Sequence, residues 1–173
     1  MSFEGIGLAQ WLVLAVAVQR IAELVVARRN TARLLTEGGT EIGRGHYLPI
    51  VLLHFSWLVV IFVRVPPDAP ANYWLIAAFL LFQLARVWVI VSLGRYWTTR
   101  VITLPNAPLV KRGPYRWLRH PNYVIVALEL AVLPLAFFDW IVAVAFSVGN
   151  GVLMAIRIPA ENRALASRRP RMD

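Results

Sequence analysis

The sequence predicts an all-α integral membrane protein with about five transmembrane helices, from its composition, its apolar runs and its charge distribution. Of the 173 residues, 59% are hydrophobic and only 16% are charged. A soluble domain averages about 45–50% apolar and roughly 25% charged residues. A chain this short cannot bury so much apolar surface, so we expect much of it to face lipid. The absence of cysteine excludes a disulfide scaffold, a Cys-ligated zinc site and thiol catalysis.

Five apolar runs define the predicted spans. The first three are each about 20 residues long, enough for a hydrocarbon core roughly 30 Å thick. The last two are shorter and meet at Phe138-Asp139-Trp140, which predicts a tight helical hairpin. The first run holds Arg20 and Glu23 and follows no basic segment, so we do not expect a cleavable signal peptide. The runs are Leu8–Ala27, Tyr47–Val65, Tyr73–Leu93, Tyr123–Phe138 and Trp140–Ile156.

The distribution of charge predicts the orientation of these spans. Fifteen of the 18 lysines and arginines fall on one side of the predicted membrane. The connections on the other side carry only Asp68 and Asp139. The positive-inside rule places the cation-rich side in the cytoplasm, with the N-terminus outside and the C-terminus inside. The net charge of +9 therefore indicates membrane topology rather than binding to nucleic acid.

Each predicted span contributes one polar residue at a similar depth, about 9–11 Å from the cytoplasmic end by helix rise. Polar groups inside a membrane are costly and usually face a cavity or a partner. The five residues are Arg20, His54, Arg86, Glu129 and Asn150.

Two interpretations of this polar layer remain open from the sequence. In the first it is a structural lattice, in which Arg20 pairs with Glu23 at i,i+3. Arg86 then pairs with Glu129, and the other polar groups bond across helices. In the second it is the floor of a substrate chamber, lined by His54, Arg86, Glu129 and Asn150.

The stretch Leu109–Tyr123 reads LVKRGPYRWLRHPNY and precedes the fourth span. Gly113-Pro114 is a turn signal, and Pro121 can open a helix at its first turn. The predicted turn therefore carries Tyr115, Arg119 and His120 to the mouth of the span. Arginine offers a planar fork for a carboxylate, and histidine can donate or accept a proton. Four cations in nine residues also fit a patch that binds lipid headgroups.

At these residues the sequence resembles the isoprenylcysteine carboxyl methyltransferase family of membrane enzymes. The family pattern is a Gly-Pro-Tyr turn, then Arg-His-Pro-x-Tyr, two apolar segments, and Arg with a Glu-Glu or Glu-x pair. The resemblance covers about residues 95–165, and Asn162 replaces the usual second Glu. Leu93–Val101 and Gln19–Glu23 are more similar to a bacterial branch that includes O-methyltransferases of alkylpyrones and alkylresorcinols. The matching residues are Gly113-Pro114-Tyr115, Arg119-His120-Pro121-Asn122-Tyr123, and Arg157 with Glu161-Asn162.

The resemblance implies S-adenosylmethionine as methyl donor, a lipid tunnel and a bacterial inner membrane. It implies one domain, with three spans in residues 1–94 and a cofactor-binding half in 95–173. A cytoplasmic pocket would be closed by the Arg-His-Pro-x-Tyr turn and the tail. The implied partners are the bilayer and a lipophilic or prenylated acceptor, with no nucleic acid and no metal. The implied cofactor-binding residues are Leu104, Val110, Gly113, Tyr115, His120, Pro121, Tyr123 and Glu161.

The expected chemistry depends on the acceptor. A carboxylate needs only orientation by cations, whereas a phenol or enol benefits from a base. His120 and Glu161 are the candidate bases. Arg119 or Arg157 would orient the acceptor or lower its pKa. The alternatives are a non-catalytic lipid-binding or scaffold protein and an NADPH-dependent sterol-reductase-like enzyme, for which five short spans are too few.

Overall fold

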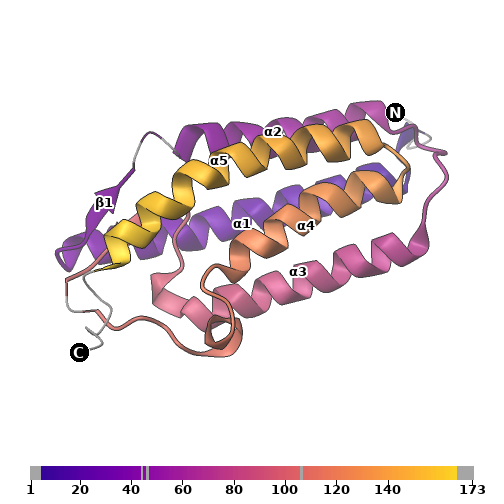
Figure 1. Ribbon diagram of the computed structural model, residues 1–173. Helices are drawn as coiled ribbons and strands as arrows, with labels where there is room; N and C mark the ends of the chain where they lie inside the picture. Colours follow the sequence, from indigo (N-terminus) through magenta and orange to yellow (C-terminus); the bar gives the residue numbers. More distant parts are fainter. Residues whose placement is uncertain (1–4, 44, 46, 106, 167–173) are drawn as a thin grey trace.

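Helices form along the apolar runs and align in one bundle, as the computed structural model of the chain shows (Figure 1). Residues 5–43, 45, 47–105 and 107–166 are described. The described α-helices are α1 (Leu8–Thr36), α2 (Tyr47–Arg64), α3 (Tyr73–Leu93), α4 (Pro121–Ala136) and α5 (Trp140–Ala166). α1 begins at one end of the bundle, and α5 ends at the opposite end.

Short elements gather at the end of the bundle where α1 and α5 end (Figure 1). There β1 (Thr40–Ile42) pairs antiparallel with β2 (Val101–Thr103), with Glu41 opposite Ile102. Two 3-10 turns follow α3, namely η3 (Gly94–Tyr96) and η4 (Gly113–Arg116). This is the cation-rich end predicted from the sequence, and it holds the motif that precedes α4.

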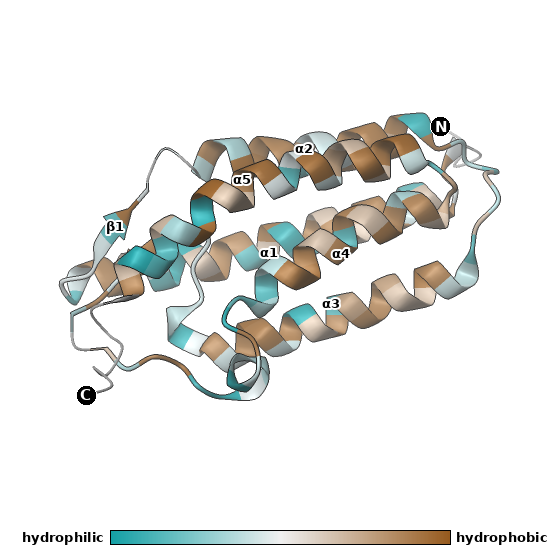
Figure 2. Ribbon diagram, viewed as in Figure 1, coloured by the Kyte–Doolittle hydropathy of each residue, from teal (hydrophilic) through white to brown (hydrophobic). Residues whose placement is uncertain are grey.

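The lengths of the helices fit a membrane protein. Among the described helices, α1, α2, α3 and α5 are long and apolar enough to cross a membrane, and α4 is shorter. With 16 residues, α4 spans about 24 Å. Figure 2 shows apolar residues along the helices and polar residues concentrated at the end with β1. Large apolar side chains such as Trp74 and Val63 are exposed. The predicted all-α membrane fold is confirmed.

Two helices continue beyond the apolar runs that predicted them. α1 extends past Ala27 to Thr36, and α5 extends past Ile156 to Ala166. The helices are longer than the predicted spans because hydropathy marks the part of a helix that contacts lipid. Alanine, leucine, arginine and glutamate continue a helix readily in water. Arg157 and Glu161 consequently lie on α5 itself, so their spacing is helical.

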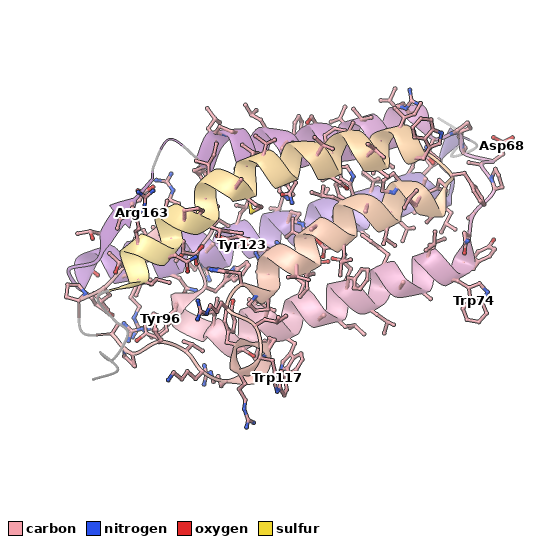
Figure 3. The ribbon with its side chains drawn as sticks, viewed as in Figure 1. Asp68, Trp74, Tyr96, Trp117, Tyr123 and Arg163 are labelled. Atoms are coloured by element: carbon pink, nitrogen blue, oxygen red, sulfur yellow. The ribbon has the colours of Figure 1, made fainter. Side chains whose placement is uncertain are left out.

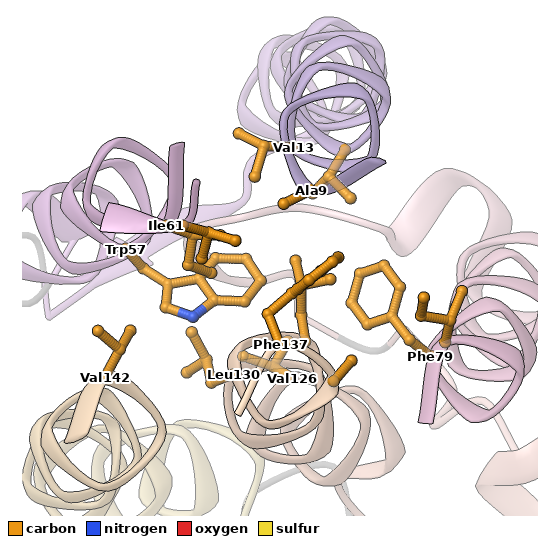
Figure 4. Close-up of a cluster of buried hydrophobic side chains, with 14 residues drawn as sticks. Ala9, Val13, Trp57, Ile61, Phe79, Val126, Leu130, Phe137 and Val142 are labelled. Atoms are coloured by element: carbon orange, nitrogen blue, oxygen red, sulfur yellow. The ribbon is translucent and has the colours of Figure 1, made fainter. Parts of the chain in front are cut away.

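Buried apolar side chains surround the polar layer on both sides. The larger cluster, which includes Trp57, Phe79 and Leu130, joins all five helices (Figure 4). A smaller cluster at the cation-rich end contains Ala27, Val89, Trp97 and Ile125. The predicted hairpin between α4 and α5 is present, and Phe138 at its tip has φ +60°. The two apolar clusters hold α1, α3 and α4 together on either side of the polar layer.

Candidate active site

A cavity of about 750 Å³ opens at the cation-rich end of the bundle. Its walls come from the end of α1, from η3 and β2, from the segment before η4, and from the last turns of α5. Pockets of about 300–1,000 Å³ are typical of small-molecule sites. Six residues predicted from the sequence line it: Leu104, Val110, Tyr115, Arg119, His120 and Glu161.

The cavity also contains residues that sequence reasoning did not assign to a site. Tyr96 and Thr98 line it from the segment after α3, and Lys111 adds a second cation beside Arg119. Leu34 and Leu165 add apolar wall from the extended ends of α1 and α5. Hydropathy could not have found these two, because both lie beyond the runs that marked the spans. Tyr96 and Thr98 lie within the segment that supported the family resemblance, and that position was the available signal.

A chain of polar contacts joins the start of α4 to the end of α5 beside the cavity. The Tyr123 hydroxyl donates to the Glu161 carboxylate. Arg157 donates from Nε to the Tyr123 hydroxyl at 2.8 Å, and from Nη2 to the Thr99 carbonyl at 2.7 Å. In Figure 3, Tyr123 lies at the cation-rich end, near the start of α4. Tyr123 and Arg157 thus hold Glu161 in place without themselves being among the described lining residues.

His120 contacts the same helix through two further side chains. Its Nε2 lies 3.3 Å from the Oδ1 of Asn162, and its Nδ1 lies 3.9 Å from Oε1 of Glu161. Its ring stacks on that of Tyr123, with centroids 5.4 Å apart. Asn162, which replaces the second Glu of the family pattern, therefore faces the histidine. The paired motifs predicted from the sequence meet in space.

The environment of Tyr115 differs from that of an exposed tyrosine. Burial raises the pKa of its hydroxyl, and the nearby Glu161 carboxylate adds to the shift. Both causes disfavour the phenolate. Tyr115 therefore presents a neutral hydroxyl and an aromatic ring to the cavity at neutral pH.

Gly113 and Pro121 shape the turn and lie outside the described lining of the cavity. Gly113 has φ +57°, and a Cβ there would lie 2.1 Å from the Oγ of Ser92. Only glycine allows both this backbone conformation and the close approach of η4 to α3. Pro121 is the first residue of α4, as predicted.

The polar layer forms a network of two carboxylates and two guanidinium groups from α1, α3 and α4. Arg20 bonds Glu23 at 3.0 Å and Glu129 at 2.6 Å. Arg86 bonds Glu23 at 2.7 Å, whereas its nearest approach to Glu129 is 3.7 Å. The predicted Arg20–Glu23 pair is confirmed, but the main carboxylate partner of Arg86 is Glu23 rather than Glu129. The Glu129 carboxylate instead accepts from Arg20 and Gln83.

The other two predicted members of the layer lie outside this network of bonds. His54 on α2 contacts the Ile50 carbonyl of its own helix through Nδ1, at 2.7 Å. Asn150 on α5 is buried, and its Oδ1 has no hydrogen-bond partner among the described residues. The four predicted substrate-binding residues His54, Arg86, Glu129 and Asn150 do not line the described cavity.

Comparison with known proteins identifies the family. The model of the isoprenylcysteine carboxyl methyltransferase family matches residues 74–167, which include η4, α4 and α5. The chain belongs to this family. An uncharacterized protein of Bacillus subtilis (strain 168), YpbQ, is 40% identical over 160 residues, which are 90% of this chain and 95% of that protein. Membership of the isoprenylcysteine carboxyl methyltransferase family and the apolar helices support a membrane methyltransferase.

Proposed function

We propose that this protein is an O-methyltransferase that uses S-adenosylmethionine to methylate a lipophilic acceptor. The acceptor oxygen belongs to a carboxylate, a phenol or an enol on a prenylated or long-chain molecule. The observation that carries the proposal is the cavity, where the turn before α4 and the end of α5 meet in a chain of the methyltransferase family. The proposed location is a bacterial inner membrane, with the cation-rich end in the cytoplasm.

The cavity residues fit the chemistry of this cofactor, which carries a carboxylate, an ammonium group, ribose hydroxyls and a planar base. Lys111 offers a cation for the carboxylate of the cofactor. Glu161 offers an acceptor for an ammonium group or hydroxyls. Leu104 and Val110 offer apolar surface for a planar base. When bound, the cofactor supplies the electrophilic methyl group, while the protein supplies position and electrostatics.

The chain's own residues then have distinct roles toward the acceptor. Arg119 orients a carboxylate acceptor, which attacks without a base. For a phenol or enol, the proton passes to the ring of His120 or to the Glu161 carboxylate. Arg157, predicted as a cation at the acceptor, is proposed here as a positioning residue that acts through Tyr123.

Calorimetry on the detergent-solubilised protein tests the cofactor. We expect S-adenosylhomocysteine to bind and NADPH not to bind. His120→Ala should lower the affinity at least about tenfold, because it removes a lining side chain. His54→Ala is the matched control and should bind normally, since His54 lies on α2 outside the described lining. Binding of NADPH alone, or of neither ligand, would overturn the proposal.

Transfer of a labelled methyl group tests the acceptor class. The protein in vesicles is incubated with methyl-labelled S-adenosylmethionine and a bacterial lipid extract. A methyl ester is released as volatile methanol by mild base, an enol ether is cleaved by acid, and an aryl ether resists both. Label that remains water-soluble, with none in the lipid fraction, would contradict a lipophilic acceptor.

A further inference from the structure

We propose that the outer face of η4, together with the adjoining part of α3, binds the headgroup of an anionic phospholipid. We call this surface the basic shoulder and define it by Trp88, Arg112, Arg116 and Trp117. It goes beyond the proposed function, because none of these four residues is among the described residues that line the cavity. The inference holds whether or not the cofactor is bound.

The charge of the basic shoulder is not balanced by the protein. The segment Leu109–Tyr123 contains four cations and no acid. Arg112 and Arg116 are exposed and form no ion pair with any acid in the described part of the chain. At the same end of the bundle, Arg95 pairs with Glu37 and Arg100 with Glu41. The shoulder therefore presents positive charge that is open to a negatively charged partner from outside the chain.

The guanidinium of Arg112 is held at a defined place. Its Nε donates to the Ser92 carbonyl at 2.7 Å, in the last turn of α3. Its terminal nitrogens donate to no acceptor among the residues that the structure describes. A fixed guanidinium with free donors suits the oxygens of a phosphate.

Two tryptophans place the shoulder at the level of the lipid headgroups. Trp117 is 72% exposed, and Trp88 on α3 is 49% exposed. Their ring centroids lie 6.1 Å apart, and the Arg116 guanidinium lies 5.9 Å from the Trp117 ring. Figure 3 shows Trp117 projecting away from the bundle at its cation-rich end. Exposed tryptophan beside arginine is typical of the membrane–water interface.

The apolar surface of Trp88 beside the two arginines indicates the chemical class of the partner. Trp88 lies five residues before the end of α3, or about 7.5 Å by helix rise, so its ring contacts the edge of the hydrocarbon. A ligand with an acyl region and a negative head would match both the tryptophans and the arginines. An anionic phospholipid has both, and its attraction to clustered arginine is a known electrostatic effect.

Quenching of tryptophan fluorescence by brominated lipids tests the proposal on the full chain in vesicles. The contribution of Trp117 is the difference between the native chain and Trp117→Phe. This quenching is measured in two kinds of mixed vesicle. In one the phosphatidylglycerol is brominated, and in the other the phosphatidylcholine is brominated. We expect quenching at Trp117 to favour phosphatidylglycerol by roughly threefold or more, and to weaken as salt is raised.

The double variant Arg112→Gln/Arg116→Gln should abolish this preference. Arg116→Gln alone should reduce it, and this residue makes no described hydrogen bond whose loss would disturb the fold. Arg28→Gln/Arg29→Gln is the matched control, because it removes an equal number of charges from exposed positions of α1. This control should keep the preference for phosphatidylglycerol. Equal quenching by the two lipids in the native background would overturn the proposal. So would a preference that survives in the shoulder variant or is lost equally in the control.

Discussion

Arg86 on α3 donates from Nη1 to the Oδ1 of Asn122, 3.2 Å away, and so connects the polar layer to the first turn of α4. The same guanidinium bonds Glu23 on α1 through Nε and Nη2. Asn122 lies between Pro121 and Tyr123, in the motif that reaches the cavity. The charged network therefore lies directly behind the candidate site. Its completed bonds favour the lattice interpretation for Arg86 and Glu129.

Glu129→Gln should destabilise the protein. Its carboxylate is buried and accepts from Arg20 at 2.6 Å and Gln83 at 3.0 Å. Breaking a buried pair leaves a charge uncompensated, which costs about 3–5 kcal/mol. Thermal unfolding in detergent measures the loss. Asp139→Asn is the control, because its partner Arg64 is exposed and solvent screens such a pair, so little stability should be lost. Normal unfolding of Glu129→Gln with a large fall in turnover would instead support the chamber floor.

Asn122→Ala should weaken S-adenosylhomocysteine binding about five- to tenfold. The expected cause is a looser first turn of α4, since a hydrogen bond to a charged group contributes roughly 1.5–3 kcal/mol. Calorimetry measures the affinity, and thermal unfolding should also show a loss of stability, because the same bond joins α3 to α4. Asn72→Ala is the matched control, because Asn72 caps α3 at the opposite end of the bundle. That control should lower stability by about 1 kcal/mol and leave the affinity unchanged. Equal affinities in the two variants would contradict a positioning role for Asn122.

Tyr123→Phe should break the link between Arg157 and Glu161, which both bond to the Tyr123 hydroxyl. Without that hydroxyl, Arg157 loses an acceptor and Glu161 loses a donor, so both side chains gain freedom. We expect S-adenosylhomocysteine affinity to fall about tenfold, by calorimetry, because the Glu161 carboxylate is no longer held. Tyr73→Phe, at an exposed position, should have no effect. An unchanged affinity in Tyr123→Phe would remove this contact from the binding site.

Gly113→Ala should lower stability by about 1–3 kcal/mol, because it adds strain at positive φ and a collision with Ser92. The double variant Gly113→Ala/Ser92→Gly removes the colliding side chain and should recover part of the loss. Thermal unfolding of the single and double variants gives the coupling between the two sites. Gly151→Ala is the control, because a Cβ there meets no described atom within 4 Å. Additive losses at positions 113 and 92 would contradict the proposed contact.

Single cysteines test the orientation, since the native chain has none. We expect Asp68→Cys to react with an impermeant thiol reagent from outside the cell, and Arg29→Cys to react only after the membrane is opened. Both positions are exposed, so their different access reports the side of the membrane. The reverse pattern would invert the proposed topology.

The sequence by itself determined the membrane class, the approximate spans, the cation-rich end and the motif that approaches the cavity. These follow from hydropathy, charge and local turn chemistry, which can be read along one dimension of the chain. Pro121 opens α4 for such a local reason, and the charged Asp139 between the last two apolar runs marks the hairpin.

Only the tertiary structure decided which side chains meet. Glu23 rather than Glu129 is the main partner of Arg86, and this choice depends on where the side chains of α1, α3 and α4 meet in the bundle. The contact between Gly113 and Ser92 likewise joins segments far apart in sequence. The same holds for the cavity wall, to which Leu34 and Leu165 contribute. Helical continuation past Ile156 brought Glu161 to Tyr123, and hydropathy cannot report it because that part of α5 is polar.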